Sequence, residues 1–478
     1  MLFNSIDYAL FFPVVFFLYW FVFKKSHKWQ NVLLLTASYF FYACWDWRFV
    51  FLLAFSTALD YFSGLMIDRA NSKKKKKFWL ILSVGINLGF LGFFKYYNFF
   101  VESFAELLQQ FGLTPHIATL NVILPVGISF YTFHGLSYVF DIYNDKIKPT
   151  RNWIDYTLFV SFFPLLVAGP IERATHLLPQ VQKARVFEYS KAVDGLRQIL
   201  WGIFKKVVIA DNCAILANDI FTNYQDLPGN TLLLGALFFT FQIYGDFSGY
   251  SDIALGSARL LGFELLQNFK FPYFSRDIAE FWRRWHVSLS SWFKDYLYIP
   301  LGGSRKGKWM SVRNTMIIFI VSGFWHGANW TFIAWGAFHG LLFLPLLLMK
   351  RNRKNTNVVA EGKVLPSIRE CFQMLTTFTI VMFGWIFFRA ESIHQAFEYI
   401  AGIFSPSFFS HIAKFDMKVL LCICVMLLVE WFNRSKQHGL QFDIKSPLIR
   451  WLIYISVSIL FFSFGAFQNH SEFIYFQF

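Results

Sequence analysis

A single histidine, His326, stands in the apolar run Ser322-Gly-Phe-Trp-His-Gly-Ala-Asn-Trp330. Ionisable side chains are costly in hydrocarbon, so a histidine in a membrane-embedded segment is a candidate for function. An unperturbed imidazole also titrates near neutrality, which lets it take up and release a proton at working pH. We therefore interpret His326 as a candidate general base inside the bilayer. The alternative is a packing histidine that is hydrogen-bonded to a backbone carbonyl.

A second chemical cluster lies in the segment 277–301, where Asp277 can cap the start of a helix. On one continuous helix, side chains three and four residues apart share a face. That face would hold Trp282, His286, Leu289 and Ser290. With Arg283 and Arg284 beside it, His286 would face a cavity next to two cations that can bind an anionic ligand. The alternative is an interfacial anchor helix, for which a Trp- and Arg-rich composition is typical.

The run Tyr244-Gly-Asp-Phe-Ser-Gly-Tyr-Ser-Asp252 places two carboxylates in a long apolar segment. Asp246 and Tyr250 are one helical turn apart, and Asp252 follows. Buried carboxylates need a charged or hydrogen-bonding partner, which Lys205, Lys206 or nearby hydroxyl groups could provide. We interpret these residues as a structural polar network that lines a cavity, in preference to an acid–base pair.

The composition indicates the class of protein to which these residues belong. The chain of 478 residues is 56% hydrophobic and only 15% charged, whereas a soluble domain has about 25% charged residues. No polar stretch is long enough for a soluble domain, so we expect one integral membrane domain over residues 1–478. The net charge of +15 comes from short basic clusters between apolar segments, which is typical of cytoplasmic loops and not of nucleic-acid binding. The cysteines and histidines show no metal-ligand spacing, so we predict no metal site.

The hydrophobic pattern predicts an all-α, multi-pass fold of about 11–12 spans. The apolar segments are 7–23, 31–44, 48–67, 78–100, 120–142, 195–218, 231–262, 313–329, 331–349, 370–389, 417–433 and 448–467. Two further apolar stretches, 154–169 and 281–301, do not fit as simple spans and predict re-entrant or interfacial helices around a central tunnel. The basic loops alternate with loops that lack Lys and Arg, which places both termini outside the cytoplasm.

Several motifs together resemble the membrane-bound O-acyltransferase family, especially its bacterial polysaccharide branch of alginate O-acetylation and teichoic acid D-alanylation. They are Phe130-Tyr-Thr-Phe-His-Gly-Leu-Ser-Tyr138, Ala168-Gly-Pro-Ile171, Phe204-Lys-Lys-Val-Val-Ile-Ala-Asp211, Asp246-Phe-Ser-Gly-Tyr-Ser-Asp252, the segment from Trp282-Arg-Arg-Trp-His286 to Pro300-Leu-Gly-Gly303, and Gly323-Phe-Trp-His-Gly-Ala328. The resemblance implies that His326 is the catalytic histidine and that His286 is the second characteristic polar residue. It also implies a bacterial cytoplasmic membrane protein.

This resemblance implies a reaction in which a cytoplasmic acyl thioester, acyl-CoA (acetyl-CoA) or an acyl carrier protein, meets an extracytoplasmic hydroxyl in a tunnel. His326 would act as general base, and Trp325, Asn329 and His286 are candidate donors to the oxyanion. No bound cofactor is expected. The ending Phe473-Ile-Tyr-Phe-Gln-Phe478 resembles tails of the same branch. We hypothesise that Tyr475 accepts the acyl group and relays it to an extracytoplasmic transferase; the alternative is an interfacial anchor.

Membrane lipid and a polysaccharide acceptor are the other expected partners.

Three other functions stay open at this point. D-alanyl transfer from a carrier protein is a variant of the same chemistry. A polysaccharide transporter would need a coupling-ion site and internal repeats, and the sequence shows no repeat. A scaffold for polysaccharide secretion would carry purely structural histidines.

Overall fold

The fold is known from a computed structural model, which describes residues 1–113, 119–120, 122–167, 169–467 and 473–474. Within these ranges, all regular secondary structure is helical. The chain divides into two compact units, Met1–Lys191 with Ala258–Leu266, and Ala192–Ser257 with Gln267–Phe478. We call them the first and the second unit. The prediction of one integral domain and the prediction of a central tunnel stay predictions.

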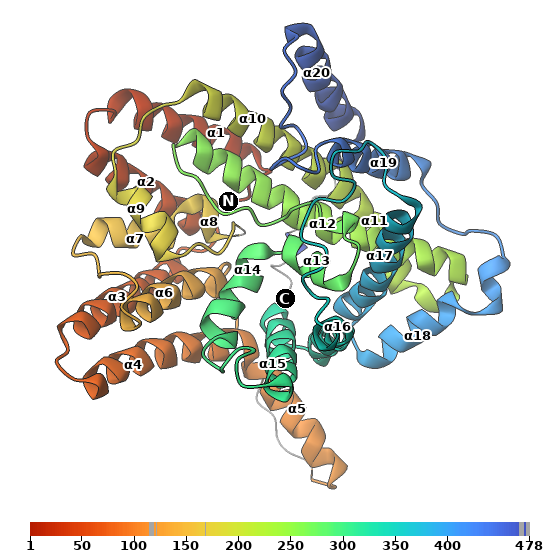
Figure 1. The fold of residues 1–478 in the computed structure, drawn as a ribbon, viewed down its shortest axis with the longest axis horizontal. Coiled ribbons are helices and arrows are strands. Elements are labelled where there is room, and N and C mark those ends of the chain that lie inside the picture. Colours follow the sequence, from red (N-terminus) through yellow and green to blue (C-terminus); the bar gives the residue numbers. More distant parts are fainter. Residues whose placement is uncertain (114–118, 121, 168, 468–472, 475–478) are drawn as a thin grey trace. The chain divides into compact units, whose positions relative to one another are not determined.

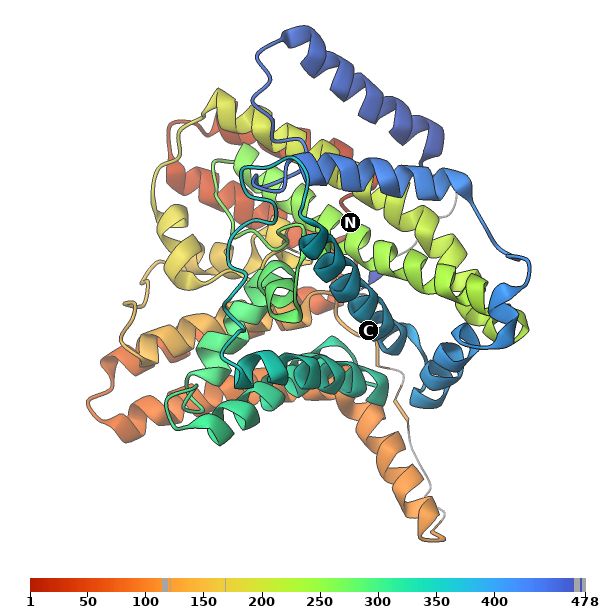
Figure 2. The ribbon, with the colours of Figure 1, turned by 45° about the vertical axis from the view of Figure 1, so that its right-hand side comes forward.

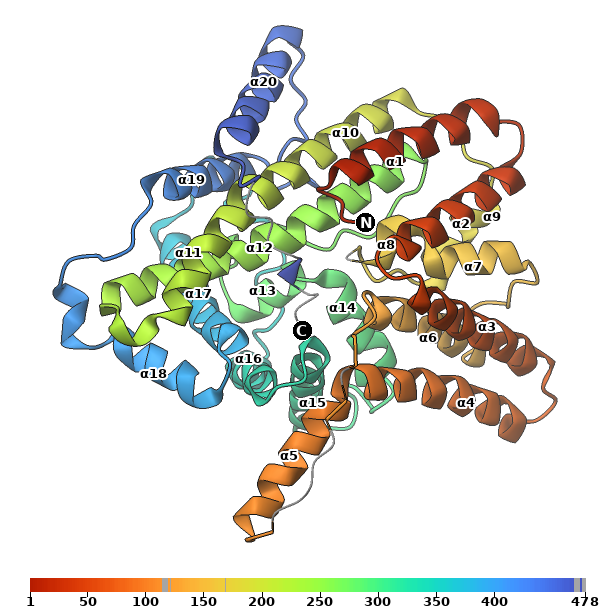
Figure 3. The ribbon, with the colours of Figure 1, turned by 180° about the vertical axis from the view of Figure 1, so that it is seen from behind.

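The first unit is a helical bundle in which α3, α4 and α6 pack against one another. Figures 1 and 3 both show these three helices side by side. Its elements are α1 (Ile6–Phe17), η1 (Leu18–Val22), α2 (His27–Ala43), α3 (Arg48–Arg69), α4 (Lys73–Leu91), η2 (Gly92–Tyr96), α5 (Tyr97–Gln110), α6 (Ile128–Tyr143), α7 (Trp153–Ser161), α8 (Phe163–Leu166) and α9 (Ala174–Gln182). Buried polar contacts join α3 to α4, because Ser83 and Asn87 both donate hydrogen bonds to Asp60 Oδ1, at 2.6 and 2.8 Å.

The second unit holds the candidate site residues that the structure describes. Its elements are α10 (Tyr189–Ile203), which begins in the first unit, η3 (Phe204–Ala210), α11 (Asp211–Thr222), η4 (Tyr224–Asp226), α12 (Gly229–Leu260), which ends in the first unit, η5 (Pro272–Phe274), α13 (Ile278–Arg284), α14 (Val287–Phe293), η6 (Lys294–Tyr298), α15 (Lys308–His326), α16 (Trp330–Leu348), α17 (Ile368–Arg389), α18 (Ile393–Ile403), η7 (Pro406–Phe409), α19 (Met417–Phe432) and α20 (Pro447–Phe464). Helices α15 and α16 form a close hairpin, and α16 also packs on α17, as seen in teal in Figure 2.

Each apolar segment that we predicted overlaps a helix, which confirms the all-α fold. Among the residues that the structure describes, six helices are long and apolar enough to cross a membrane, namely Arg48–Arg69, Lys73–Gln110, Gly229–Leu260, Trp330–Leu348, Ile368–Arg389 and Pro447–Phe464. The segment predicted from residue 120 becomes helical only at Ile128, directly after Gly127, whose backbone is left-handed with φ +74°. The two stretches that we predicted as re-entrant or interfacial each form several short helices instead of one continuous helix. Residues 154–169 contain α7 and α8, and residues 281–301 contain α13, α14 and η6.

Candidate active site

The two histidines singled out in the sequence lie next to each other in the second unit. Their ring centroids are 6.5 Å apart, and the residues are only 1% (His286) and 2% (His326) exposed. Aromatic rings surround His326, with centroids 4.9 Å away for Trp325, 5.1 Å for Trp335 and 5.4 Å for Phe388. Residues 40 positions apart in the sequence thus form one buried pair of imidazoles in aromatic surroundings.

His326 is the last residue of its helix, and three residues connect it to the next helix. Helix α15 ends at His326, and Gly327 is extended. Asn329 then caps α16: its Oδ1 accepts a hydrogen bond from Thr331 N at 3.0 Å, and its Nδ2 donates to Glu391 O at 2.9 Å. These contacts give Asn329 a structural role at the helix start, while its proposed role as an oxyanion donor stays a prediction.

Gly323 allows α15 to approach α16 closely, and its replacement by alanine is a test of this packing. A Cβ atom at position 323 would lie 2.2 Å from the backbone oxygen of Phe332, so the two helices would have to move apart. We expect Gly323→Ala to lower the free energy of unfolding by about 2 kcal/mol, as for other overpacked interiors. The midpoint of thermal unfolding in detergent measures this effect. In the control Gly85→Ala the new methyl group meets no atom within 4 Å, so a similar loss there would contradict the steric explanation.

His286 lies at a break between α13 and α14, which corrects our prediction of one continuous helix. Its backbone is left-handed, with φ +43° and ψ +53°, and the residue is the N-cap of α14. Trp282 therefore belongs to α13 and Ser290 to α14, and the predicted shared face of Trp282, His286, Leu289 and Ser290 was wrong. His286 lies outside the six helices that could span a membrane. Burial lowers the pKa of its imidazole to about 3, so the ring is neutral.

The two arginines beside His286 are engaged by the protein itself. Arg283 donates to the carbonyl oxygens of Asn352 and Asn355, at 2.5 and 2.7 Å. Arg284 forms an ion pair with Glu280 at 2.7 Å. Asp277 caps α13 as predicted, because its Oδ1 accepts from Glu280 N at 2.7 Å. The binding of an anionic ligand by these arginines stays a hypothesis.

The carboxylates of α12 are paired with the two lysines that we named as possible partners. Lys206 Nζ lies 2.8 Å from Asp246 Oδ1 and 2.8 Å from Asp211 Oδ1. Lys205 Nζ lies 2.7 Å from Asp252 Oδ2. These residues therefore form a paired network, and its interpretation as a structural polar network that lines a cavity stays a prediction. Tyr250 is also part of it, because Lys206 Nζ lies 5.6 Å from the centroid of its ring.

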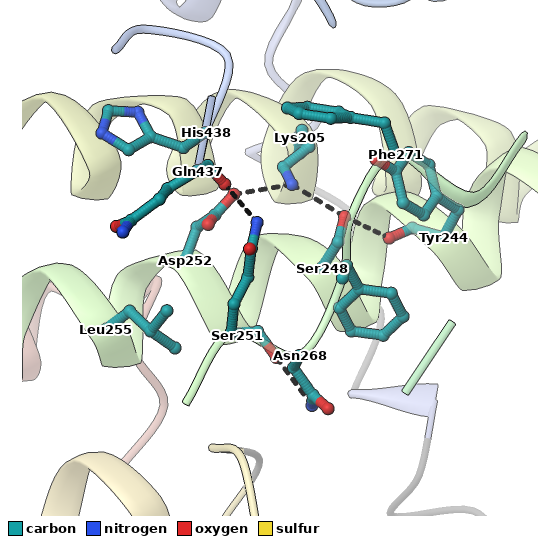
Figure 4. A pocket seen from close by; sticks show the side chains of 12 residues that line it. Lys205, Tyr244, Ser248, Ser251, Asp252, Leu255, Asn268, Phe271, Gln437 and His438 are labelled. Atoms are coloured by element: carbon teal, nitrogen blue, oxygen red, sulfur yellow. Dashed lines mark hydrogen bonds and ion pairs between the residues drawn. The ribbon is translucent and has the colours of Figure 1, made fainter. Parts of the chain in front are cut away.

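A small polar pocket opens beside this network, and its lining includes a residue that the sequence analysis did not single out. Figure 4 shows Lys205 pointing between Asp252 and Ser248, and Asn268 lying next to Ser251. The lining is formed by Lys205, Tyr244, Ser248, Ser251, Asp252, Leu255, Gln267, Asn268, Phe269, Phe271, Gln437 and His438. Asn268 joins the pocket to the histidine pair, because its Oδ1 lies 3.1 Å from His286 Nδ1. Nothing in the local sequence around Asn268 indicates this distant contact.

The C-terminal tail reaches the same network through its two described residues. Phe473 and Ile474 are 0% and 2% exposed. Ile474 N donates to Asp246 Oδ2 at 2.7 Å, and the Phe473 ring lies 4.5 Å from that of Tyr250 between centroids. The candidate relay residue, Tyr475, lies outside the described residues.

The fold and the site define an all-α protein with several membrane-spanning helices and a buried pair of histidines. Residues 127–388 match the sequence model of the membrane-bound O-acyltransferase family. The chain is 42% identical to the probable alginate O-acetylase of Pseudomonas putida, over 84% of this chain and 80% of the relative. It is 32% identical to the peptidoglycan O-acetyltransferase of Helicobacter pylori, over 100% and 98%, and 30% identical to the teichoic acid D-alanyltransferase of Bacillus subtilis, over 59% and 72%. The chain belongs to the membrane-bound O-acyltransferase family, and it is an O-acyltransferase.

Proposed function

We propose that this enzyme moves an acetyl or other short acyl group from a cytoplasmic thioester to hydroxyl groups of an extracytoplasmic polysaccharide. The observation that carries the proposal is the buried pair His286 and His326 in a chain of this family. The names of its relatives, an alginate O-acetylase and a peptidoglycan O-acetyltransferase, favour an acetyl group and a polysaccharide acceptor. The name of the D-alanyltransferase relative makes D-alanyl transfer the second candidate.

In the proposed reaction, His326 accepts the proton of the acceptor hydroxyl while the hydroxyl oxygen attacks the thioester carbonyl. The tetrahedral intermediate then expels the thiolate, which takes up a proton, and an ester remains on the acceptor. Exclusion of water by the surrounding aromatic side chains limits hydrolysis of the thioester. Trp325, buried beside His326, is a candidate donor to the oxyanion through its indole N–H.

The donor is acetyl-CoA or an acylated carrier protein, and the transfer is either direct or through an extracytoplasmic partner transferase. We propose that the enzyme lies in the bacterial cytoplasmic membrane with both termini outside, because loops rich in Lys and Arg favour the cytoplasmic side. Labelling of a single cysteine introduced at each terminus with a membrane-impermeant reagent in intact cells tests this orientation. Labelling only after permeabilisation would contradict it.

Chemical analysis of the cell-surface polysaccharides tests the proposed function. We expect cells that lack the protein to lose ester-linked acetyl groups from one surface polymer, and the wild-type gene to restore them. Mass spectrometry of the polymer before and after mild alkali identifies both the acyl group and its acceptor. Loss of ester-linked D-alanine in place of acetate would favour the second candidate. Unchanged esterification with reduced export of the polymer would favour a transporter or a secretion scaffold.

We further propose that Tyr475 relays the acyl group, because the two residues before it are anchored in the interior. The hydrogen bond from Ile474 N to Asp246 and the burial of Phe473 hold the chain directly before a hydroxyl nucleophile. In this step the phenol of Tyr475 gives its proton to His326 as its oxygen attacks the thioester carbonyl. The thiolate then leaves and takes up a proton, and an acyl ester of tyrosine remains. An extracytoplasmic transferase would then move the acyl group to the polysaccharide.

Replacement of Tyr475 by phenylalanine tests the relay. The variant keeps the aromatic ring and loses only the nucleophilic oxygen, so we expect polysaccharide acetylation to fall by at least about 100-fold. The acetyl ester content of the surface polymer measures the effect, with membrane protein levels as reference. The matched control Phe476→Tyr, with Tyr475 kept, adds a phenol and should acetylate normally. Normal acetylation in Tyr475→Phe would contradict the relay and favour an anchoring role.

A further inference from the structure

Asn268 makes a convergent set of contacts with the helix break that carries His286. The residue is 1% exposed. Its Oδ1 lies 3.1 Å from His286 Nδ1, 2.9 Å from Ser288 Oγ and 3.4 Å from Ser288 N. Its Nδ2 donates to Ser251 Oγ at 3.3 Å. One amide side chain therefore joins α12, through Ser251, to both sides of the N-terminus of α14.

These contacts determine which nitrogen of His286 carries the proton. A backbone N–H can only donate, so the atom of Asn268 that faces Ser288 N must be the carbonyl oxygen. A carbonyl oxygen can only accept, so His286 Nδ1 must donate to it. In a neutral imidazole the other nitrogen then has no hydrogen and presents a lone pair. His286 is thus held as the Nδ1–H tautomer, with Nε2 as the acceptor.

The backbone around Asn268 is fixed to the same break. Val287 N donates to Asn268 O at 2.9 Å, and Lys270 N donates to Arg284 O at 2.9 Å. These bonds lie on the two sides of His286, whose left-handed backbone is uncommon for a residue other than glycine. The segment that carries Asn268 therefore supports the strained residue as well as its ring.

The His286 ring is buried among aromatic groups. Among the described residues Nε2 has no hydrogen-bond partner. The ring lies 4.7 Å from that of Phe247, 6.0 Å from that of Trp325 and 6.5 Å from that of His326, measured between centroids. A buried acceptor without a partner carries a free-energy cost, so its retention beside His326 points to a bound group that donates to it.

We propose that Asn268 is a positioning residue that fixes His286 in the Nδ1–H tautomer, so that Nε2 accepts a hydrogen bond from an O–H or N–H group of the substrate. This inference rests on the proposed function for its consequence in catalysis, but not for the tautomer itself. It also narrows the roles open to His286. Because Nε2 carries no hydrogen, His286 does not donate to the oxyanion, and that charge is stabilised by other groups.

Solid-state NMR of the full-length protein in lipid bilayers tests the tautomer without any substrate. With ¹⁵N-labelled histidine, His286 is assigned as the signal pair that disappears in His286→Gln. We expect a protonated Nδ1 and an unprotonated Nε2 in the wild type, and a changed or mixed state in Asn268→Leu. The control Asn314→Leu removes another buried amide, which donates to Gly303 O at 2.9 Å, and it should leave the His286 signals unchanged. A wild-type ring protonated at Nε2, or an unchanged tautomer in Asn268→Leu, would overturn the proposal.

Kinetics in membrane vesicles with radiolabelled acetyl-CoA as the donor test the consequence. We expect Asn268→Leu to lower kcat by about 100-fold with KM little changed, in the range of general acid–base contributions. Asn268→Asp keeps the accepting oxygen and should retain at least about a tenth of kcat. Its carboxylate favours the imidazolium form, so the acid limb of its pH profile should move to higher pH. If the role of Asn268 were merely structural, kcat would fall to a similar extent in both variants and the pH profile would not move.

The two experiments separate a failure of this inference from a failure of the proposed function. If the wild type transfers no acetyl group while the NMR signals behave as expected, the donor or the reaction is wrong and the tautomer assignment stands. If the wild type is active and Asn268→Leu keeps both the tautomer and its kcat, Asn268 does not position His286. Asn268→Ser provides a smaller variant for the same NMR measurement if Asn268→Leu does not fold.

Discussion

Replacement of His326 by alanine is expected to remove nearly all acyl transfer while the protein continues to accumulate in the membrane. The residue is 2% exposed, ends α15 and lies beside His286, the other buried histidine of the candidate site. Loss of a general base lowers the rate by about 100- to 10,000-fold, so we expect a fall of about 1,000-fold in acyl ester formation. The ester content of the surface polymer, divided by the amount of protein in the membrane, measures this effect.

A different buried histidine, His134, provides the matched control for this prediction. His134 in α6 is 0% exposed, and it belongs to the first unit. We assign His134 no part in acyl transfer, so His134→Gln should transfer acyl groups at a rate close to that of the wild type. If His326→Ala retains normal esterification, His326 is a packing residue and the scaffold function regains support. If both variants lose activity together with their membrane levels, the loss reflects folding, and His326→Gln, which preserves more of the side-chain volume, becomes the decisive variant.

The sequence was sufficient to predict the features of the fold and the site that depend on local composition. Long apolar segments in the sequence became helices because a chain in lipid must satisfy its backbone hydrogen bonds within each segment. The pairing of Lys206 with Asp246 was predictable for a similar reason, since a buried carboxylate needs a charged or hydrogen-bonding partner. The resemblance to the family identified His286 and His326 together, and the structure brings them to 6.5 Å between ring centroids.

The features that the sequence did not reveal depend on single backbone conformations or on distant contacts. Helical spacing placed His286 on a continuous helix, but a left-handed φ of +43° at this residue breaks the helix. No pattern in the sequence indicates such a conformation in a residue other than glycine. Asn268 lies 18 positions before His286, and Ile474 lies 228 positions after Asp246. Hydrophobic periodicity carries no information about either pair.

The second large effect is expected at Lys206, whose replacement by methionine should strongly destabilise the second unit. The Lys206 side chain is 0% exposed and bridges Asp211 and Asp246, whose side chains are 0% and 3% exposed. Methionine has a similar length but no charge, so two carboxylates would be left buried without their cation. Removal of one partner from a buried ion pair costs about 3–5 kcal/mol. The midpoint of thermal unfolding of the full-length protein in detergent, followed by tryptophan fluorescence, measures the loss.

Two variants determine whether unpaired buried carboxylates cause the loss of stability in Lys206→Met. Lys436→Met breaks a surface pair with Asp443, in which the two side chains are 39% and 86% exposed, and it should change stability by less than about 1 kcal/mol. Combination of Lys206→Met with Asp211→Asn and Asp246→Asn removes all three charges, and it should recover most of the stability, because a neutral buried group does not need the lost cation. In that variant the amide side chain at position 246 still offers a carbonyl oxygen to Ile474 N, so the anchored tail should persist. An unfolding midpoint of Lys206→Met equal to that of the wild type would contradict a buried ionic network and imply that water reaches these carboxylates.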